Sequence, residues 1–441
     1  MVFRKLFGGR PAEATNASTD DAPDGVEQYD AEVAEQDAAV DAEALARHDW
    51  GARAAEVLPT GASTGSKRPA ALWGAGADGP THFVRAAGCM VTDADGETYV
   101  DCTMSLGAVA LGYGEKRVVA AVADAAARGN VAGLSAVEEV EVAERLCDLI
   151  PCAEQVVFTK SGADAVSAAV RLARAYTGRD HVVASGYFGW HDWWSDAKGV
   201  PAGVRGDVTR VAFDDVAALE QAVSAAGSRL AAIVLEPVVE RLPSDAWIQR
   251  ARQLADATGA VLVFDEMKTG FRLRPAGYQE LSGITPDLAT FGKAMTNGFP
   301  LAAVVGRRDV MQAARDTWIS TTLASESTAL AAAGAVLDWH VEADICATLW
   351  ETGAELRARV VDALEASGCT GVTIDGIDPM WFMKWDDPAR ESLFLVAAAR
   401  AGALFKRGAY NYAAVAHDDE AIIAIERAAS EAFITVRDSD R

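Results

Sequence analysis

Residues 260–272 read AVLVFDEMKTGFR, and this stretch decides the fold. Its first five residues are all apolar with no polar alternation, which is typical of a strand that is buried on both faces. The run ends in Asp265 and Glu266. A carboxylate at the end of a buried strand costs free energy unless a cation or a hydrogen-bond donor lies beside it. We therefore expect a polar site at this end of the strand.

Similar apolar runs recur along the chain and alternate with helical patterns. Helical periodicity is found at residues 216–227 and 247–259, and a long helical stretch runs from Gly162 to Thr177. This alternation predicts an α/β fold in which a mostly parallel sheet is covered by helices on both sides. The strand-like runs are residues 155–160, 181–186, 210–215, 231–238, 260–266 and 302–307.

The flanking regions predict a second, smaller unit. Residues 82–102 read as two strands around a turn at residues 93–96, and residues 116–129 and 137–150 have helical periodicity. A helix from Ser325 to about His340 leads to a C-terminal α+β unit, with strands expected at residues 372–377 and 380–385. The expected domains are an acidic arm at 1–50, the N-terminal part of a small domain at 51–129, a large domain at 130–325, and a linking helix with the C-terminal small domain at 326–441.

Composition excludes several classes of partner. The 441 residues carry a net charge of −24, which disfavours nucleic acid and anionic membrane surfaces because both attract clustered Lys and Arg. No apolar run approaches the ~20 residues of a transmembrane helix. Residues 1–50 hold twelve acidic and four basic residues and predict a disordered or helical arm.

The six cysteines predict reduced thiols in a cytoplasmic protein. They are scattered without CxxC spacing, which argues against a disulfide framework and against a metal site. Core packing is the expected role of each of them.

One lysine stands out further along the chain. Residues 289–300 read ATFGKAMTNGFP, which places Lys293 after Gly292 and before an Asn297-Gly298 turn signal, among small and apolar residues. A lysine on a solvated face normally has charged neighbours, and Lys293 has none before Arg307. In a parallel sheet, ligands gather at the carboxyl ends of strands. Lys293 is therefore expected to meet the Asp265 site.

The other strand ends supply what one cofactor needs. Ser161 and Gly162 open a helix after a strand, where free backbone N–H groups can bind phosphate. Residues 187–194, YFGWHDWW, supply aromatic side chains after another strand. A phosphate cradle, an aromatic plate, a buried carboxylate for a pyridine nitrogen and a lysine that forms a Schiff base predict pyridoxal 5′-phosphate.

Longer segments resemble a known family. VLVFDEMKTGFR (261–272) followed by GITPDLATFGKAMTNGFPLAAVVGRRDVM (283–311) is similar to the signature of the class III, fold-type I, pyridoxal phosphate-dependent aminotransferases. Within them the chain most resembles the branch that contains glutamate-1-semialdehyde 2,1-aminomutase. The 28-residue interval between Asp265 and Lys293 fits the family's aspartate-to-lysine spacing, and the similarity spans roughly residues 60–435.

The resemblance implies a role for individual residues. Lys293 would be the Schiff-base lysine, Asp265 the partner of the pyridine nitrogen, and Thr322 would reach the phosphate of a neighbouring subunit in a homodimer with shared active sites. Ala163, where Thr or Ser is common, and Phe188, in place of the usual His, depart from the family pattern. The implied cofactor-binding residues are Ser161, Gly162, Ala163, Tyr187, Glu236, Asp265, Met267, Lys293 and Thr322.

Basic and polar residues near both ends of the chain are candidates for binding the substrate. A substrate carboxylate favours a forked arginine; Arg68, with Lys67 as an equal choice, lies near the position of the aminomutase's substrate arginine, and Arg407 and Asn411 fall in a segment that usually borders the substrate pocket. His191 and His417 are expected to be structural. The leading hypothesis is transamination between an amino donor and an aldehyde or keto acceptor. The alternatives are a 2,1-aminomutase and a protein that binds the cofactor or a partner without turnover.

Overall fold

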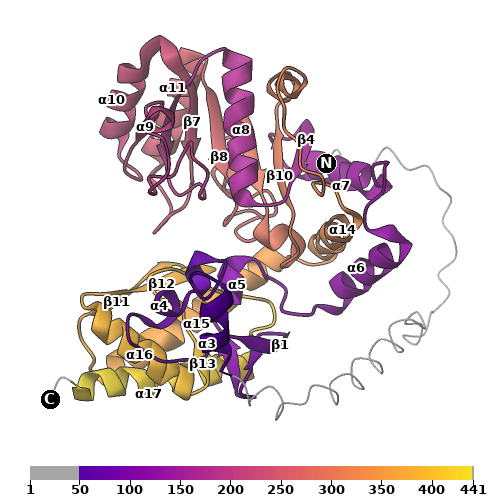
Figure 1. The fold of residues 1–441 in the computed structure, drawn as a ribbon. Helices are drawn as coiled ribbons and strands as arrows, with labels where there is room; N and C mark the ends of the chain where they lie inside the picture. The colour runs from indigo at the N-terminus through magenta and orange to yellow at the C-terminus, as the bar shows by residue number, and fades with distance from the viewer. Residues whose placement is uncertain (1–48, 440–441) are drawn as a thin grey trace, which may run out of the picture. The chain divides into compact units, whose positions relative to one another are not determined.

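The computed structural model describes residues 49–439, which belong to one compact unit, His48–Arg441 (Figure 1). The acidic arm expected at residues 1–50 lies outside the described residues, except for its last two. None of the described helices is long and apolar enough to cross a membrane. Within residues 49–439, no group of His, Cys, Asp and Glu side chains is arranged to hold a metal ion.

A seven-stranded sheet forms the centre of the fold, in the order β4-β10-β9-β8-β7-β5-β6. β10 is antiparallel to both of its neighbours, β4 and β9, and the other pairs are parallel. The predicted mostly parallel sheet is thus confirmed. The strands are β4 (Gln155–Thr159), β5 (His181–Ser185), β6 (Val208–Arg210), β7 (Leu230–Leu235), β8 (Val261–Asp265), β9 (Leu288–Phe291) and β10 (Ala302–Gly306).

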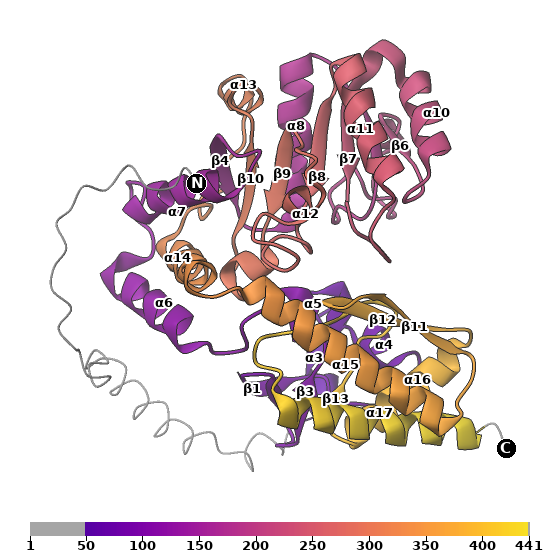
Figure 2. The same ribbon diagram turned by 180° about the vertical axis from the view of Figure 1, so that it is seen from behind.

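Helices cover both faces of this sheet. Figures 1 and 2 show α8 (Gly162–Thr177) on one face, and α10 (Val216–Ala226) and α11 (Asp245–Thr258) on the other. Along β8, Val263 is buried in one cluster with Val166 of α8, whereas Phe264 is buried in another with Ile248 of α11. Every residue of β8 is buried, so its sequence is apolar without alternation.

A third layer covers the β4–β10–β9 side of the sheet. It consists of α6 (Lys116–Gly129), α7 (Val137–Leu149) and α14 (Ser327–Glu342), which pack against one another and contribute to a common buried cluster. Phe291 of β9 and Val305 of β10 belong to that cluster. The sheet end that carries Lys293 is therefore anchored on this layer.

Two smaller sheets are built from the two ends of the described chain. β1 (Phe83–Ala87), β2 (Met90–Asp93) and β3 (Thr98–Asp101) form an antiparallel meander, and β13 (Ala403–Leu404) joins β3 in parallel. β11 (Val372–Ile377), β12 (Met380–Trp385) and β14 (Asn411–Tyr412) form an antiparallel sheet. The division into domains at residues 51–129, 130–325 and 326–441 stays a prediction.

The C-terminal helices pack together beside these sheets (Figure 2). α17 (Asp419–Ser439) contacts both α15 (Ile345–Ser367) and α16 (Pro388–Arg400), and the rings of Phe394 and Phe433 lie 4.6 Å apart. The remaining helices are short: α3 (Trp50–Val57), α4 (Pro69–Trp73), α5 (Met104–Gly107), α9 (Ala202–Arg205), α12 (Tyr278–Ser282) and α13 (Arg308–Met311). Single 3₁₀ turns are η1 (Gly65–Lys67), η2 (Gly227–Arg229), η3 (Lys293–Thr296) and η4 (Gln312–Arg315).

Two strand predictions differ from the structure. Residues 82–102 form three strands rather than two, because Gly88 adopts a left-handed φ of 57° and interrupts the first run. The strand expected at residues 210–215 ends at Arg210, and the chain turns at Asp214, which has a φ of 61° and accepts hydrogen bonds from Ser244. An apolar pattern does not reveal such left-handed residues.

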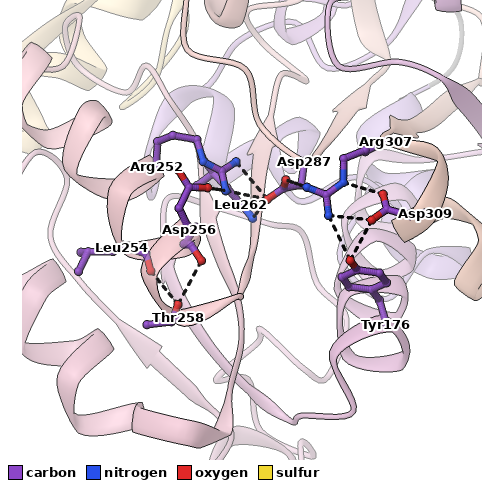
Figure 3. Close-up of polar contacts among 10 residues, drawn as sticks. Tyr176, Arg252, Leu254, Asp256, Thr258, Leu262, Asp287, Arg307 and Asp309 are labelled. Atoms are coloured by element: carbon purple, nitrogen blue, oxygen red, sulfur yellow. Dashed lines mark hydrogen bonds and ion pairs between the residues drawn. The ribbon is translucent and has the colours of Figure 1, made fainter.

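An ion-pair network fixes the amino-terminal ends of β8 and β9 (Figure 3). The buried carboxylate of Asp287 lies 3.1 Å from Arg252 and 2.7 Å from Arg307, and it accepts the N–H of Leu262 at 2.8 Å. Arg307 also binds Asp309 at 2.6 Å. The carboxyl-terminal ends of β8 and β9 are not part of this network and are available for a functional site.

Candidate active site

A cavity of about 520 Å³ opens at the carboxyl ends of the central strands. Its wall includes residues that stand one or two positions after the ends of β4, β5, β7, β8 and β9. Such a position is where parallel sheets bind ligands. The lining residues are Ala108, Lys160, Ser161, Gly162, Ala163, Tyr187, Phe188, Gly189, Glu236, Val239, Asp265, Met267, Lys268, Gly292, Lys293, Gly298, Phe299, Pro300, Leu301 and Tyr410.

Lys293 enters this cavity from the turn between β9 and β10. It begins η3 with a left-handed φ of 49°, a conformation that costs a non-glycine residue about 1–2 kcal/mol. Asn297 ends the turn and fixes it, because its side chain accepts from the N–H groups of Ala110 and Leu111 and donates to Gly112. Strain held by the surrounding structure is typical of a functional position.

The amine of Lys293 is poised to be a nucleophile. Burial and the neighbouring ammonium of Lys268 lower the pKa of Lys293 to about 8. Within the described residues, no side chain or carbonyl accepts a hydrogen bond from this amine. A lysine with a depressed pKa and an unblocked amine suits attack on a carbonyl group.

Asp265 presents one carboxylate oxygen to the cavity. Its Oδ1 accepts hydrogen bonds from Thr290 at 2.9 Å and from the N–H of Met267 at 3.1 Å. Its Oδ2 has no partner among residues 49–439. Burial and repulsion from Glu236 raise the pKa of Asp265 to about 7. A cationic or N–H donor in the cavity would relieve this cost.

Two other charged residues of the segment 260–272, Glu266 and Arg272, do not line the cavity. Glu266 is fully buried and accepts from Thr269 and from the N–H groups of Tyr278 and Gln279, so it is structural. The buried guanidinium of Arg272 donates to the carbonyls of Gly107, Pro379 and Ala413, so it too is structural.

The amino terminus of α8 forms an anion site at one end of the cavity. Ser161 caps the helix and forms a capping box with Asp164. The N–H groups of Gly162 and Ala163, in the first turn, have no acceptor in the described part of the chain. Together with the helix dipole, these groups form a cradle for a phosphate.

Met267 packs tightly on the cradle and on the lysine turn. A Cβ atom on Gly162 would lie 3.0 Å from its Sδ, and a Cβ on Gly292 would lie 2.8 Å from it. Tyr187 borders the cavity from the other strand end and is 69% exposed. The two glycines thus leave room for the Met267 thioether between the start of α8 and the turn that carries Lys293.

Lys268 and Glu236 form an ion pair in the cavity wall, which the sequence analysis did not predict. The ammonium of Lys268 lies 2.6 Å from Oε1 of Glu236 and 4.2 Å from the ring centroid of Tyr410. Oε2 of Glu236 accepts the N–H of Tyr187 at 3.1 Å. Lys268 lies three residues after Asp265 in the segment DEMKTGFR. A lysine so close in sequence to the predicted active-site carboxylate could have indicated that it lies in the site.

Several predicted site residues lie outside the cavity lining. Thr322 is exposed, Arg68 is exposed at the start of α4, and Arg407 lies 3.6 Å from Glu391. Asn411 is buried and accepts the backbone N–H of Lys406 at 2.9 Å. The substrate roles of Arg68, Arg407 and Asn411 therefore stay predictions that the cavity lining does not support.

The two histidines are hydrogen-bonded within the protein, as expected. Nδ1 of His191 lies 2.7 Å from Oγ of Ser167, and its Nε2 lies 3.5 Å from Asp164. His417 lies between the N–H of Ala414 and the carbonyl of Asp101, and burial lowers its pKa to about 4. Neither histidine lines the cavity.

Comparison with known proteins settles the family. The sequence model of the family described as aminotransferase class-III matches residues 75–189 and 199–408, which include every strand that borders the cavity. This chain belongs to the class-III aminotransferase family. It is a pyridoxal phosphate-dependent enzyme of fold-type I, as its sequence resemblance implied.

Relatives of this class-III aminotransferase include two kinds of enzyme. It is 37% identical over 311 residues to the 2′-deamino-2′-hydroxyneamine transaminase of Streptomyces kanamyceticus, which covers 70% of this chain and 78% of the relative. It is 32% identical over 422 residues to the glutamate-1-semialdehyde 2,1-aminomutase of Laribacter hongkongensis, which covers 87% of this chain and 98% of that one.

Solved structures share the fold of this class-III aminotransferase. The FumI protein of Sphingopyxis sp. MTA144, in its PLP internal aldimine form, matches with a TM-score of 0.84 and 27% identity, over 89% of this chain and 96% of that one. An omega-transaminase from Sphaerobacter thermophilus matches with a TM-score of 0.79 and 25% identity, over 88% and 97% of the two chains.

The cavity residues fit pyridoxal phosphate. The free N–H groups at the start of α8 suit the phosphate, the unpartnered Oδ2 of Asp265 suits a protonated pyridine nitrogen, and the unblocked amine of Lys293 suits the aldehyde. Eight of the nine predicted cofactor residues line this one cavity, and Thr322 is the exception.

Proposed function

We propose that this chain moves an amino group from an amino donor to an aldehyde or keto acceptor, with Lys293 as its catalytic residue. The strongest support is that Lys293, Asp265 and the first residues of α8 line the same cavity. When bound there, pyridoxal phosphate supplies an aldehyde that condenses with amines and a ring that withdraws electrons.

Each residue has a stated task in this proposal. Lys293 would hold the cofactor through its aldehyde in the resting enzyme. When a substrate amine takes that position, the freed Lys293 amine would move the proton at the substrate's Cα, which its pKa of about 8 permits near neutral pH. Asp265 would hold the cofactor's ring nitrogen through Oδ2.

The remaining cofactor contacts are also proposals. Ser161, Gly162 and Ala163 would bind the phosphate, and Met267 and Tyr187 would contact the two ring faces. Glu236 would stand near the ring, and Thr322 would contact the phosphate of a partner subunit.

A reduction experiment tests the role of Lys293. The protein reconstituted with pyridoxal phosphate is treated with borohydride and digested, and the cofactor mass is located by peptide mass spectrometry. The label is expected on Lys293 and absent from Lys293→Ala. A label on another lysine, or full turnover by Lys293→Ala, would refute the proposal.

A donor screen then identifies the reaction. Amines are added singly to the reconstituted protein, and the loss of the cofactor's visible absorbance is followed. An amino donor that bleaches the absorbance, with recovery on addition of a keto acid or aldehyde, supports transamination. A protein that binds the cofactor but responds to no amine would instead support the non-catalytic alternative.

The second candidate is a 2,1-aminomutase, because the aminomutase relative aligns over almost its whole length. An aminomutase converts glutamate 1-semialdehyde without any second substrate, whereas a transaminase requires an external acceptor. Product formation from the semialdehyde alone, measured by chromatography, distinguishes the two.

We also propose a homodimer with shared active sites. Among the exposed large apolar side chains, Tyr187 lines the cavity, and Val131 and Leu134 lie on the segment between α6 and α7. Contact with a second copy would remove this surface from water. Sedimentation is expected to give twice the chain mass, and a monomer that retains full activity would refute the shared site. The exposed residues include Val131, Leu134, Val137, Tyr187, Trp190 and Trp318.

A cytoplasmic location is the last part of the proposal. All six cysteines are free thiols, and five of them are buried. Burial raises the pKa of Cys152 and Cys346, which keeps these thiols protonated and unreactive. Fractionation of cells that express the full chain tests this location.

A further inference from the structure

We propose that Lys268 binds the carboxylate of an amino-acid substrate in the cofactor cavity. This inference rests on the proposed function, because it names the chemical group by which one substrate of that reaction is held. It makes Lys268 a specificity-determining residue, separate in role from Lys293.

The cavity offers few cations for an anionic group. Its lining contains three lysines, Lys160, Lys268 and Lys293, and no arginine. Lys160 already donates to Oε1 of Glu326 at 2.8 Å and to the carbonyl of Pro300 at 2.9 Å. Lys293 is the reactive amine. Lys268 is therefore the cation that remains for a substrate.

The Lys268 ammonium can donate further hydrogen bonds. An ammonium carries three N–H donors, and within the described residues its hydrogen-bond and ion-pair partner is the carboxylate of Glu236, at 2.6 Å. Its side chain is only 10% exposed and it lines the cavity, so a further acceptor for this ammonium would be a group bound in the cavity. A buried ammonium with unspent donors gains from an added anion.

The position of this ammonium is fixed before substrate arrives. Glu236 binds it on one side and is itself held by the N–H of Tyr187 at 3.1 Å. The ring of Tyr410 lies 4.2 Å from the ammonium, and the Tyr410 hydroxyl donates to the carbonyl of Val239. A side chain that is already immobilised loses little entropy when a ligand binds.

This geometry predicts opposite changes in carboxylate affinity for Lys268→Met and Glu236→Gln. Lys268→Met removes the donor, so carboxylate affinity should fall about 10- to 100-fold, the range for a lost hydrogen bond to a charged group. Glu236→Gln keeps the ammonium and removes the negative charge next to the bound carboxylate, so carboxylate affinity should rise. A purely structural ion pair would lose affinity in both variants.

The probe is glutarate, a dicarboxylate without an amino group, and glutaramide is its uncharged counterpart. Binding of each to the reconstituted holoenzyme is measured by isothermal titration calorimetry. The wild-type protein is expected to bind glutarate at least tenfold more tightly than glutaramide. Lys268→Arg should retain this preference, and Lys384→Met, which removes an exposed lysine on β12, should leave it unchanged.

Three results would overturn the proposal. They are equal glutarate affinity in wild type and Lys268→Met, equal affinity of the wild type for glutarate and glutaramide, and no glutarate binding by the wild type. If circular dichroism shows that Lys268→Met does not fold, Glu236→Gln provides the test. Its glutarate affinity should be higher than that of the wild type, and an equal or lower affinity would overturn the proposal.

The proposed function is tested separately with isopropylamine, an amine without a carboxylate. Bleaching of the wild-type holoenzyme absorbance by this amine is expected whether or not Lys268 binds a carboxylate, because the amine carries none. Bleaching that is intact while glutarate preference is absent refutes only the role of Lys268. Absence of bleaching by any amine refutes the proposed function.

Discussion

The hydroxyl of Thr290 donates a 2.9 Å hydrogen bond to Oδ1 of Asp265, and the two residues are register partners on neighbouring parallel strands. This hydrogen bond lowers the pKa of Asp265 against the larger effect of burial. Thr290 therefore orients the carboxylate and leaves Oδ2 for the cofactor.

Thr290→Val should weaken cofactor binding about tenfold, because a hydrogen bond to a charged group is lost while the volume is kept. Equilibrium dialysis of the apoprotein against pyridoxal phosphate measures the change. Ser at this position keeps the hydroxyl and should restore most of the affinity. Unchanged affinity in Thr290→Val would show that Asp265 does not need this partner.

The rate of cofactor capture should depend on pH through Lys293. Since burial and Lys268 lower its pKa to about 8, the reactive free amine predominates above pH 8 and the ammonium below it. The rate at which the apoprotein captures pyridoxal phosphate, followed by stopped-flow absorbance, should therefore rise with pH to a midpoint near 8. In Lys268→Met the midpoint should move higher, and a midpoint near 10.5 in the wild type would contradict the assignment.

Gly162 and Met267 should be energetically coupled. Gly162→Ala places a Cβ 3.0 Å from Sδ of Met267, and the displaced thioether should reduce cofactor affinity. Met267→Val should relieve part of this loss, with a coupling energy of about 1 kcal/mol in a double-mutant cycle. Gly334→Ala, where a Cβ meets nothing within 4 Å, is the matched helical control. Additive effects would refute the contact.

The left-handed φ of Lys293 predicts a stability difference between two inactive variants. Lys293→Gly should be more stable than Lys293→Ala by about 1 kcal/mol in urea unfolding of the apoprotein, since glycine adopts a φ of 49° without steric cost. Both variants lose the reactive amine. Equal stability would mean that the turn relaxes when the lysine is removed.

Asp287 should matter far more for stability than Asp309, although both bind Arg307 (Figure 3). Asp287→Asn leaves Arg252 and Arg307 without their buried partner and should cost about 3–5 kcal/mol. Asp309 is 52% exposed, so Asp309→Asn should cost less than about 1 kcal/mol. Thermal unfolding of the two variants provides the comparison.

The sequence predicts most of the sheet and of the cofactor site, because both are written in short local patterns. The long helix was expected over Gly162–Thr177 and α8 has these bounds, and the strands expected at residues 372–377 and 380–385 are β11 and β12. Asp265 and Lys293 stand at strand ends, where a buried carboxylate and a lone lysine are conspicuous. Those features need no knowledge of distant contacts.

The features that the sequence does not predict depend on long-range contacts. β9 has four residues, too few for a periodic pattern, and it is defined by its neighbours β8 and β10. The pairing of Lys268 with Glu236 joins residues from two different strand ends. The guanidinium of Arg272 donates to the carbonyls of Gly107, Pro379 and Ala413, which lie more than a hundred residues away in sequence.

The parallel pair of β3 and β13 has a consequence for biosynthesis. β3 ends at Asp101 and its partner strand begins at Ala403, so about 300 residues are translated between them. At typical synthesis rates of 5–20 residues per second, the open edge of β3 would wait about 15–60 s for its partner. During that interval the nascent chain presents an unpaired strand to chaperones, or to a neighbouring nascent chain.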